Sequence, residues 1–155
     1  TLRNKRLAKA VEQWRVIPGK ELFQYYDDEG NRRPIESGMV NDYIKAAMGA
    51  DFSAKDFRTW AGSIHALDVL CALPEAGEES ERKKNVVAML DFVSGKLGNS
   101  RAICKKYYVH PGLVRMYEKN NFSRYLRLAS ETAGDSENNG LTSSEKVLLK
   151  ILKAS

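Results

Sequence analysis

Two adjacent tyrosines preceded by two lysines form the first candidate site for chemistry in this sequence. They are Lys105, Lys106, Tyr107 and Tyr108. A tyrosine hydroxyl titrates at about pH 10 and is a poor nucleophile by itself, but nearby cations stabilise the phenolate and attract a phosphodiester. Tyrosines at such spacing are also common as core and boundary aromatics of helices. The pair therefore indicates either a nucleophile for phosphate chemistry or ordinary packing.

Lys55 and Arg58 form a second candidate site, in this case for a phosphate group. They follow Ser53, a suitable N-cap residue, and stand three residues apart, so on a helix they share one face near its N-terminus. Helix N-termini favour anions, and an arginine can contact two phosphate oxygens at once. The alternative is a pair of ordinary surface cations on an amphipathic helix.

Composition limits the chemistry that these residues can serve. The 155 residues are 43% hydrophobic and 29% charged, which suits a folded domain and excludes a disordered chain. The sequence contains no apolar run of about 18 residues, so it predicts no membrane span. Cys71 and Cys104 form neither a CxxC pair nor a disulfide framework, so we expect a reducing, cytoplasmic location. The sequence has no phosphate-loop, HExxH or paired-carboxylate motif, so we expect no cofactor and no metal.

The positive charge is concentrated in two zones. The chain carries a net charge of +5. Residues 1–20 hold six Lys or Arg against one Glu, and residues 101–127 hold seven Lys or Arg against one Glu. Two basic zones on a mildly acidic body are typical of a protein that binds a polyanion, although solvated helix faces have the same pattern.

Apolar spacing and capping residues predict a chain of helices that would position these side chains. Gly98 is expected to end one helix, and Thr142 with Glu145 forms a capping box for the last one. Residues 133–140 are expected to be a polar linker, and no strand pattern is recognised. We therefore expect an all-α chain forming a single domain over residues 1–155. The predicted helices cover residues 6–15, 35–48, 54–73, 80–97, 100–108, 113–119 and 142–153.

Three segments, in the same order as in a known family, carry a resemblance. They are Lys55-Asp56-Phe57-Arg58-Thr59-Trp60, Leu97-Gly98-Asn99-Ser100 and Cys104-Lys105-Lys106-Tyr107-Tyr108-Val109-His110-Pro111. Together they resemble the catalytic domain of type IB DNA topoisomerases, in the bacterial and poxvirus-like branch and closest to its bacterial members. Residues 1–6, 21–25 and 140–142 also resemble family segments, so the likeness covers nearly all of the chain.

The resemblance implies a mainly helical catalytic core, shared with tyrosine recombinases, that acts on double-stranded DNA. In this family a tyrosine attacks a phosphodiester, forms a 3′-phosphotyrosyl link and releases a 5′-hydroxyl. The strand swivels and the 5′-hydroxyl reseals it, which requires neither ATP nor a metal. A bacterial cytoplasmic enzyme that acts as a monomer would fit this reading.

The family's roles can be carried over by position. Tyr108 matches the nucleophile, because it stands ten residues after Gly98, whereas Tyr107 is one residue out of register. Arg58 would hold a nonbridging phosphate oxygen. Asn99 stands where poxvirus and eukaryotic relatives have a histidine, and its amide can donate a hydrogen bond but cannot titrate.

The remaining cations are expected to contact DNA. The resemblance makes Lys55 a phosphate contact, and the second basic zone adds three more candidates to the DNA-binding set. Those three are Arg101, Lys105 and Lys106.

Two catalytic parts of the family have no match in this sequence. The family's second arginine and its general-acid lysine, which lies on a β-hairpin, come before the segment that residues 1–6 resemble, as does its N-terminal domain. General acid catalysis contributes about a hundredfold to ten-thousandfold in rate. We therefore expect this chain to be a catalytic lobe or fragment with little activity alone.

Two other classes of protein remain open from the sequence. A tyrosine recombinase would have the same fold, although that class usually carries a His-x-x-Arg motif and a different tyrosine block. A catalytically inactive helical DNA-binding module would also fit the basic zones.

Overall fold

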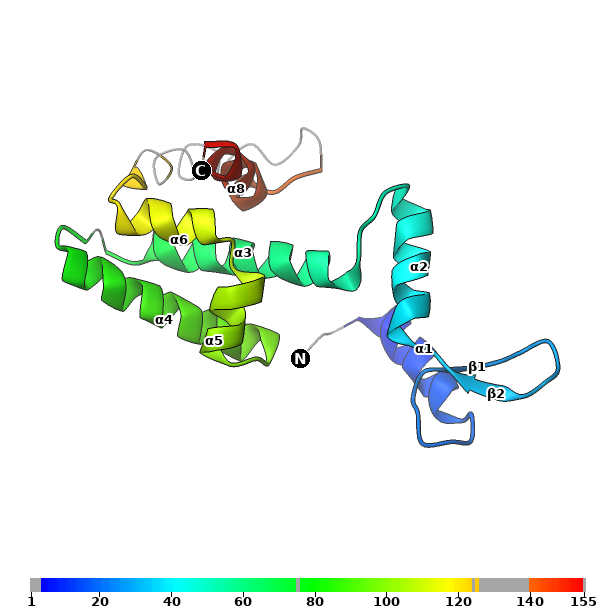
Figure 1. The fold of residues 1–155 in the computed structure, drawn as a ribbon. Helices are drawn as coiled ribbons and strands as arrows, with labels where there is room; N and C mark the ends of the chain where they lie inside the picture. The colour runs from blue at the N-terminus through cyan, green and yellow to red at the C-terminus, as the bar shows by residue number, and fades with distance from the viewer. Residues whose placement is uncertain (1–3, 75, 124, 126–139, 155) are drawn as a thin grey trace. The chain divides into compact units, whose positions relative to one another are not determined.

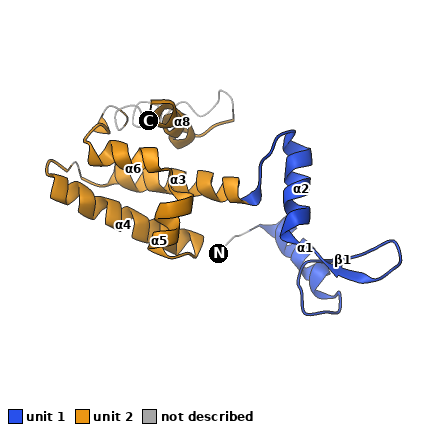
Figure 2. Ribbon diagram, in the orientation of Figure 1, with its two compact units in different colours: residues 1–54 blue, residues 55–155 orange. Residues whose placement is uncertain are grey.

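A computed structural model describes residues 4–74, 76–123, 125 and 140–154. The chain divides into two compact units, residues 1–54 and residues 55–155 (Figure 2). All of the candidate site residues lie in the second unit. No helix in the described part of the chain is long and apolar enough to span a membrane. The expectation of a single catalytic domain stays a prediction.

The first unit contains two helices and a β-hairpin (Figure 1). Helix α1 (Lys5–Arg15) precedes strands β1 (Gln24–Tyr26) and β2 (Arg32–Pro34), and α2 (Ser37–Met48) follows. The strands are antiparallel, and Tyr25 is opposite Arg33. The all-α expectation is therefore wrong for this segment, although the chain as a whole is mainly α. Strands of three residues are too short to show the alternation by which a strand is recognised.

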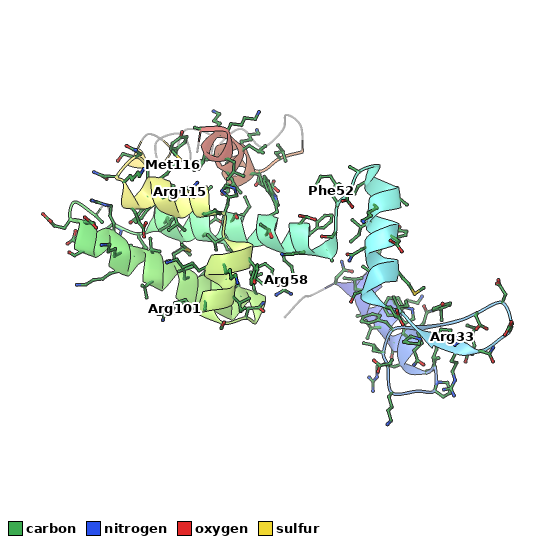
Figure 3. The ribbon with its side chains drawn as sticks, in the orientation of Figure 1. Arg33, Phe52, Arg58, Arg101, Arg115 and Met116 are labelled. Carbon is green, nitrogen blue, oxygen red and sulfur yellow. The ribbon has the colours of Figure 1, made fainter. Side chains whose placement is uncertain are left out.

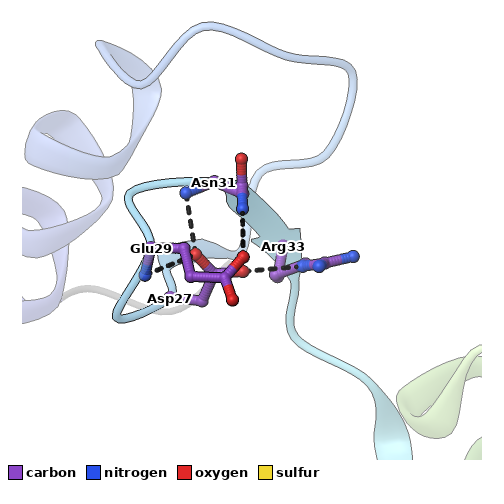
Figure 4. Close-up of polar contacts among 4 residues, drawn as sticks. All are labelled: Asp27, Glu29, Asn31 and Arg33. Carbon is purple, nitrogen blue, oxygen red and sulfur yellow. Dashed lines mark hydrogen bonds and ion pairs between the residues drawn. The ribbon is translucent and has the colours of Figure 1, made fainter.

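The hairpin is closed by the side chain of Asp27 (Figure 4). Its carboxylate accepts hydrogen bonds from the backbone N–H groups of Glu29 and Asn31, at 3.2 and 2.7 Å, and from Arg33 Nε at 2.9 Å. The Arg33 contact and then the Asn31 N–H hold the pKa of Asp27 below its ordinary value. These contacts lie within seven residues of chain, so the turn itself determines which strand residues pair.

The second unit packs its helices around one apolar core (Figure 1). Helices α3 (Ala54–Ala72) and α4 (Glu79–Leu97) are the longest, and both end close to their predicted positions. Glu78 and Glu81 form a capping box at the start of α4, and Gly98 ends that helix in the left-handed conformation, with φ 65°. The largest fully buried side chains of the core are those of Leu67, Leu70, Met89, Val93, Cys104, Leu113, Val147, Leu148 and Ile151.

The segment that carries the tyrosines differs from the single helix predicted over residues 100–108. It forms a short α-helical turn, α5 (Arg101–Ile103), and then a π-helical turn, η1 (Cys104–Tyr108). Helix α6 (Pro111–Glu118) begins two residues earlier than predicted. It can do so because proline suits the first helical turn and because His110 Nδ1 accepts the Gly112 N–H at 3.1 Å.

The last helix, α8 (Ser143–Ala154), begins where its capping box predicts, and its buried apolar residues belong to the core. Thr142 N–H donates to Glu145 Oε2 at 2.8 Å, and Glu145 N–H donates to Thr142 Oγ1 at 3.3 Å. Glu145 also accepts a hydrogen bond from Trp60 Nε1 of α3, at 3.0 Å. The predicted linker over residues 133–140 lies outside the described residues except for Gly140. The cap and the tryptophan contact together hold α8 on α3.

This attachment should make stability depend on pH. The Trp60 hydrogen bond and then the two from Thr142 hold the pKa of Glu145 below its ordinary value of 4.5. A lowered pKa gives stability that is present above the unfolded-state pKa and is lost as pH falls through the folded-state pKa. We expect Glu145→Gln to cost about 1 kcal/mol near neutral pH and progressively less below pH 4.5. Urea unfolding followed by tryptophan fluorescence measures this; a cost that is the same at neutral and acidic pH would contradict it.

Candidate active site

The π-helical turn determines where the tyrosine segment points. Ser100 caps the preceding turn by accepting the Ile103 N–H at 3.3 Å. The Val109 N–H donates to the carbonyl oxygen of Cys104, five residues before it, at 2.9 Å. The backbone of Val109 itself is extended. A π-helical turn contains one more residue than an α-helical turn, and such turns often occur at functional sites. The turn therefore rotates the residues at its end relative to a continued α-helix.

Arg58, Asn99 and Tyr108 are brought together at the C-terminal end of α4. Arg58 Nη2 and Asn99 Nδ2 both donate to the Leu97 carbonyl oxygen, each at 2.9 Å. The Arg58 guanidinium also lies over the Tyr108 ring, with Cζ 4.9 Å from the ring centroid. Arg58 projects from α3 on the side that faces α5 (Figure 3). The last carbonyls of a helix lack intrahelical donors, so Leu97 provides an acceptor that both side chains can share.

Tyr107 has different neighbours from Tyr108. Its ring lies near two ammonium groups, with Lys55 Nζ at 5.0 Å and Lys106 Nζ at 4.9 Å from the ring centroid. Tyr107 is exposed, whereas Tyr108 is half-buried beside Arg58. The two tyrosines are therefore in different environments, as we expect if Tyr108 alone is the nucleophile. Their roles stay predictions.

The four predicted DNA contacts are not equivalent. Lys55 and Lys106 flank Tyr107, and Lys105 is exposed on the same turn. Arg101 instead forms a two-pronged ion pair with Asp91 of α4, with Nε–Oδ1 at 2.6 Å and Nη2–Oδ2 at 2.8 Å. Both side chains are about half exposed, so the pair is screened by solvent. DNA would have to compete with Asp91 for Arg101. No local sequence pattern indicates this pair, because Asp91 belongs to another helix.

Both cysteines lie in surroundings that raise the pKa of the thiol. Burial raises the pKa of the Cys104 thiol, and the nearby Arg58 guanidinium opposes that shift. Burial and then the Asp68 carboxylate raise the pKa of Cys71 to about 11. Because the thiolate is the reactive form, these shifts disfavour the reactive form of both groups. No group of three or more His, Cys, Asp or Glu side chains that could hold a metal ion occurs among the described residues.

Sequence reasoning missed the residues that support this site. Thr59 and Ser63 of α3 both form hydrogen bonds with the backbone of the tyrosine segment, and Gly62 lies directly against it. A signal was available, because a glycine in the middle of a helix normally requires a reason. No sequence signal indicates the role of the Leu97 carbonyl, since a backbone acceptor cannot be recognised from residue type.

Comparison with known proteins identifies the family of this chain. A family model described as eukaryotic DNA topoisomerase I, catalytic core, matches residues 1–131. The chain therefore belongs to the type IB DNA topoisomerase family, which confirms the predicted family.

One viral relative matches most of this chain with a smaller part of its own length. It is the DNA topoisomerase 1B of Acanthamoeba polyphaga mimivirus, which is 28% identical over 127 residues. The match covers 77% of this chain and 38% of the relative. The chain thus spans less than half of the length of that protein.

Proposed function

We propose that this chain is the catalytic domain, or a part of it, of a type IB topoisomerase that relaxes supercoiled double-stranded DNA. The enzyme is an isomerase that acts in the cytoplasm as a monomer. The observation that carries the proposal is the position of Arg58, which contacts the Tyr108 ring and shares the Leu97 carbonyl oxygen with Asn99. This arrangement supports a site in which a guanidinium and an amide act on a phosphate group beside the tyrosine.

The reaction is a transesterification at phosphorus. Tyr108 Oη passes its proton to solvent and attacks the phosphorus, and the bond from phosphorus to the 5′-oxygen breaks. The 5′-oxygen takes a proton from the general acid that the resemblance places outside the matched segments, and it leaves as a hydroxyl. Arg58 exchanges its bond to Leu97 O for a nonbridging phosphate oxygen and stabilises the charge that grows there. Asn99 donates a second hydrogen bond. Religation is the reverse reaction, so the phosphotyrosine conserves the energy of the broken bond.

Plasmid relaxation with a denaturing quench tests the proposal. The complete gene product should be used, because the resemblance assigns the acid that protonates the 5′-oxygen to a lysine outside the matched segments. Covalent adducts at many sites, together with relaxation without ATP or divalent metal, are the expected result. Adducts at one specific sequence would indicate a recombinase. DNA binding without adducts would indicate an inactive module and would overturn the proposal.

Lysine charge reversal near the tyrosines should weaken binding to all DNA sequences alike. Phosphate contacts release counterions, so affinity falls steeply with salt, and removing one contact lowers the slope by about one unit. We expect Lys105→Glu to lower affinity and slope for unrelated duplexes equally. Fluorescence anisotropy over a salt series measures both.

Lys84→Glu is the matched control, because it makes the same charge change about 20 Å along α4 from Leu97. It should leave the slope close to that of the parent protein. Equal effects of the two variants would show that net charge, and not a contact near the tyrosines, controls binding.

A further inference from the structure

The side of α3 that faces the tyrosine segment holds that segment's backbone at three successive points. Thr59 Oγ1 donates to the Tyr107 carbonyl oxygen at 3.1 Å. Ser63 is 2% exposed, and its Oγ accepts the His110 N–H at 3.1 Å. Gly62 lies between them in sequence and packs closely against the backbone carbonyl group of Tyr108. We call Thr59, Gly62 and Ser63 the α3 platform.

Gly62 allows an approach that no other residue would permit. A Cβ atom built on Gly62 would lie 2.4 Å from the Tyr108 carbonyl oxygen and 3.1 Å from its carbonyl carbon. Both atoms belong to the backbone and cannot rotate away as a flexible side chain would. Glycine inside a helix is about 0.5–1 kcal/mol less favourable than alanine. Glycine at this position therefore lowers the stability of α3, but it allows the tyrosine segment to pack closely against that helix.

The platform acts on backbone atoms, so it sets the register of the segment and not merely the orientation of one ring. The Tyr107 carbonyl, the Tyr108 carbonyl and the His110 N–H each have their own place on α3. A slip of one residue would lose these contacts together and bring Tyr107 to the place of Tyr108. In the observed register Tyr108 lies under Arg58, and Tyr107 lies between the lysines.

We propose that Thr59 and Gly62 are positioning residues that hold Tyr108, and not Tyr107, in front of Arg58. The inference rests on the proposed function and adds to it the residues that select the nucleophile. Neither residue touches the DNA phosphate in this scheme. Their loss should therefore slow strand cleavage without weakening DNA binding.

The first test compares two glycine-to-alanine variants of the complete gene product. Gly62→Ala must displace the tyrosine segment, whereas Gly95→Ala in α4 has no atom within 4 Å of the new Cβ and only improves helix propensity. A displacement of about 1 Å costs on the order of a hundredfold in rate. We expect that loss in single-turnover adduct formation for Gly62→Ala, with unchanged DNA affinity, and the parent rate for Gly95→Ala.

The second test uses the hydroxyl of Thr59 and applies even if Gly62→Ala fails to fold. Thr59→Val keeps the shape but removes the donor, whereas Thr59→Ser keeps the donor. The single hydroxyl hydrogen is shared with the Lys55 carbonyl, also at 3.1 Å, so the expected slowing is modest, about threefold to tenfold. Thr59→Ser should restore the parent rate.

The outcomes separate the inference from the proposed function. A parent protein that forms no adduct would overturn the function itself. A parent protein that forms adducts, with Gly62→Ala or Thr59→Val cleaving at the parent rate, would overturn the positioning inference and leave the function intact. Equal losses in Thr59→Val and Thr59→Ser would also count against it, because the hydroxyl would then not be the group that acts.

Discussion

Tyr108→Phe should end covalent adduct formation while DNA binding persists. The substitution removes one oxygen atom and keeps the ring, so the contact with the Arg58 guanidinium at 4.9 Å is retained. Without the hydroxyl no bond to phosphorus can form, and the loss should be complete. Quenched cleavage of labelled duplex DNA, followed by peptide mapping of the adduct from the parent protein, measures this effect.

Tyr107→Phe is the matched control for this prediction. It makes the same chemical change one residue away and keeps the ring between Lys55 and Lys106. We expect adduct formation within a few-fold of the parent rate. If Tyr107→Phe were the inactive variant and Tyr108→Phe the active one, the assignment of the nucleophile would be off by one residue.

Arg58→Lys should slow strand cleavage by about a hundredfold to a thousandfold while DNA affinity changes little. Lysine keeps the positive charge but lacks the planar fork that can contact two oxygen atoms. Loss of one preorganised donor to a transition state costs about 2.7–4 kcal/mol. Because the interaction is strongest in the pentacoordinate state, the effect belongs in the cleavage rate and not in binding. Single-turnover cleavage at saturating protein separates the two.

Arg33→Lys is the control for Arg58, since it makes the same change at an exposed arginine outside both basic zones. Arg33 pairs with Asp27, and an exposed ion pair contributes about 0–1 kcal/mol. Its replacement should leave the cleavage rate almost unchanged. Cleavage by Arg58→Lys within a few-fold of the parent rate would remove Arg58 from the catalytic residues and make it a surface cation.

Local sequence signals determined most of the helices of this protein. The end of α4 follows from Gly98, which reaches the left-handed conformation with little strain. The start of α8 follows from the reciprocal bonds of Thr142 and Glu145. Such signals act within about one helical turn, so they can be recognised without the rest of the fold. The order of the three resembling segments likewise identified the family before any geometry was known.

The arrangement of the site depends instead on contacts between distant residues. Arg58 and the Leu97 carbonyl are 39 residues apart, and Thr59 and the Tyr107 carbonyl are 48 residues apart. No local pattern encodes the close approach at Gly62. The π-helical turn and the pairing of Arg101 with Asp91 were missed for a similar reason, because both follow from the packing of the tyrosine segment against α3 and α4. The sequence determined which residue types were available, and the tertiary structure decided which tyrosine meets which cation, because only packing brings backbone atoms from different helices into register.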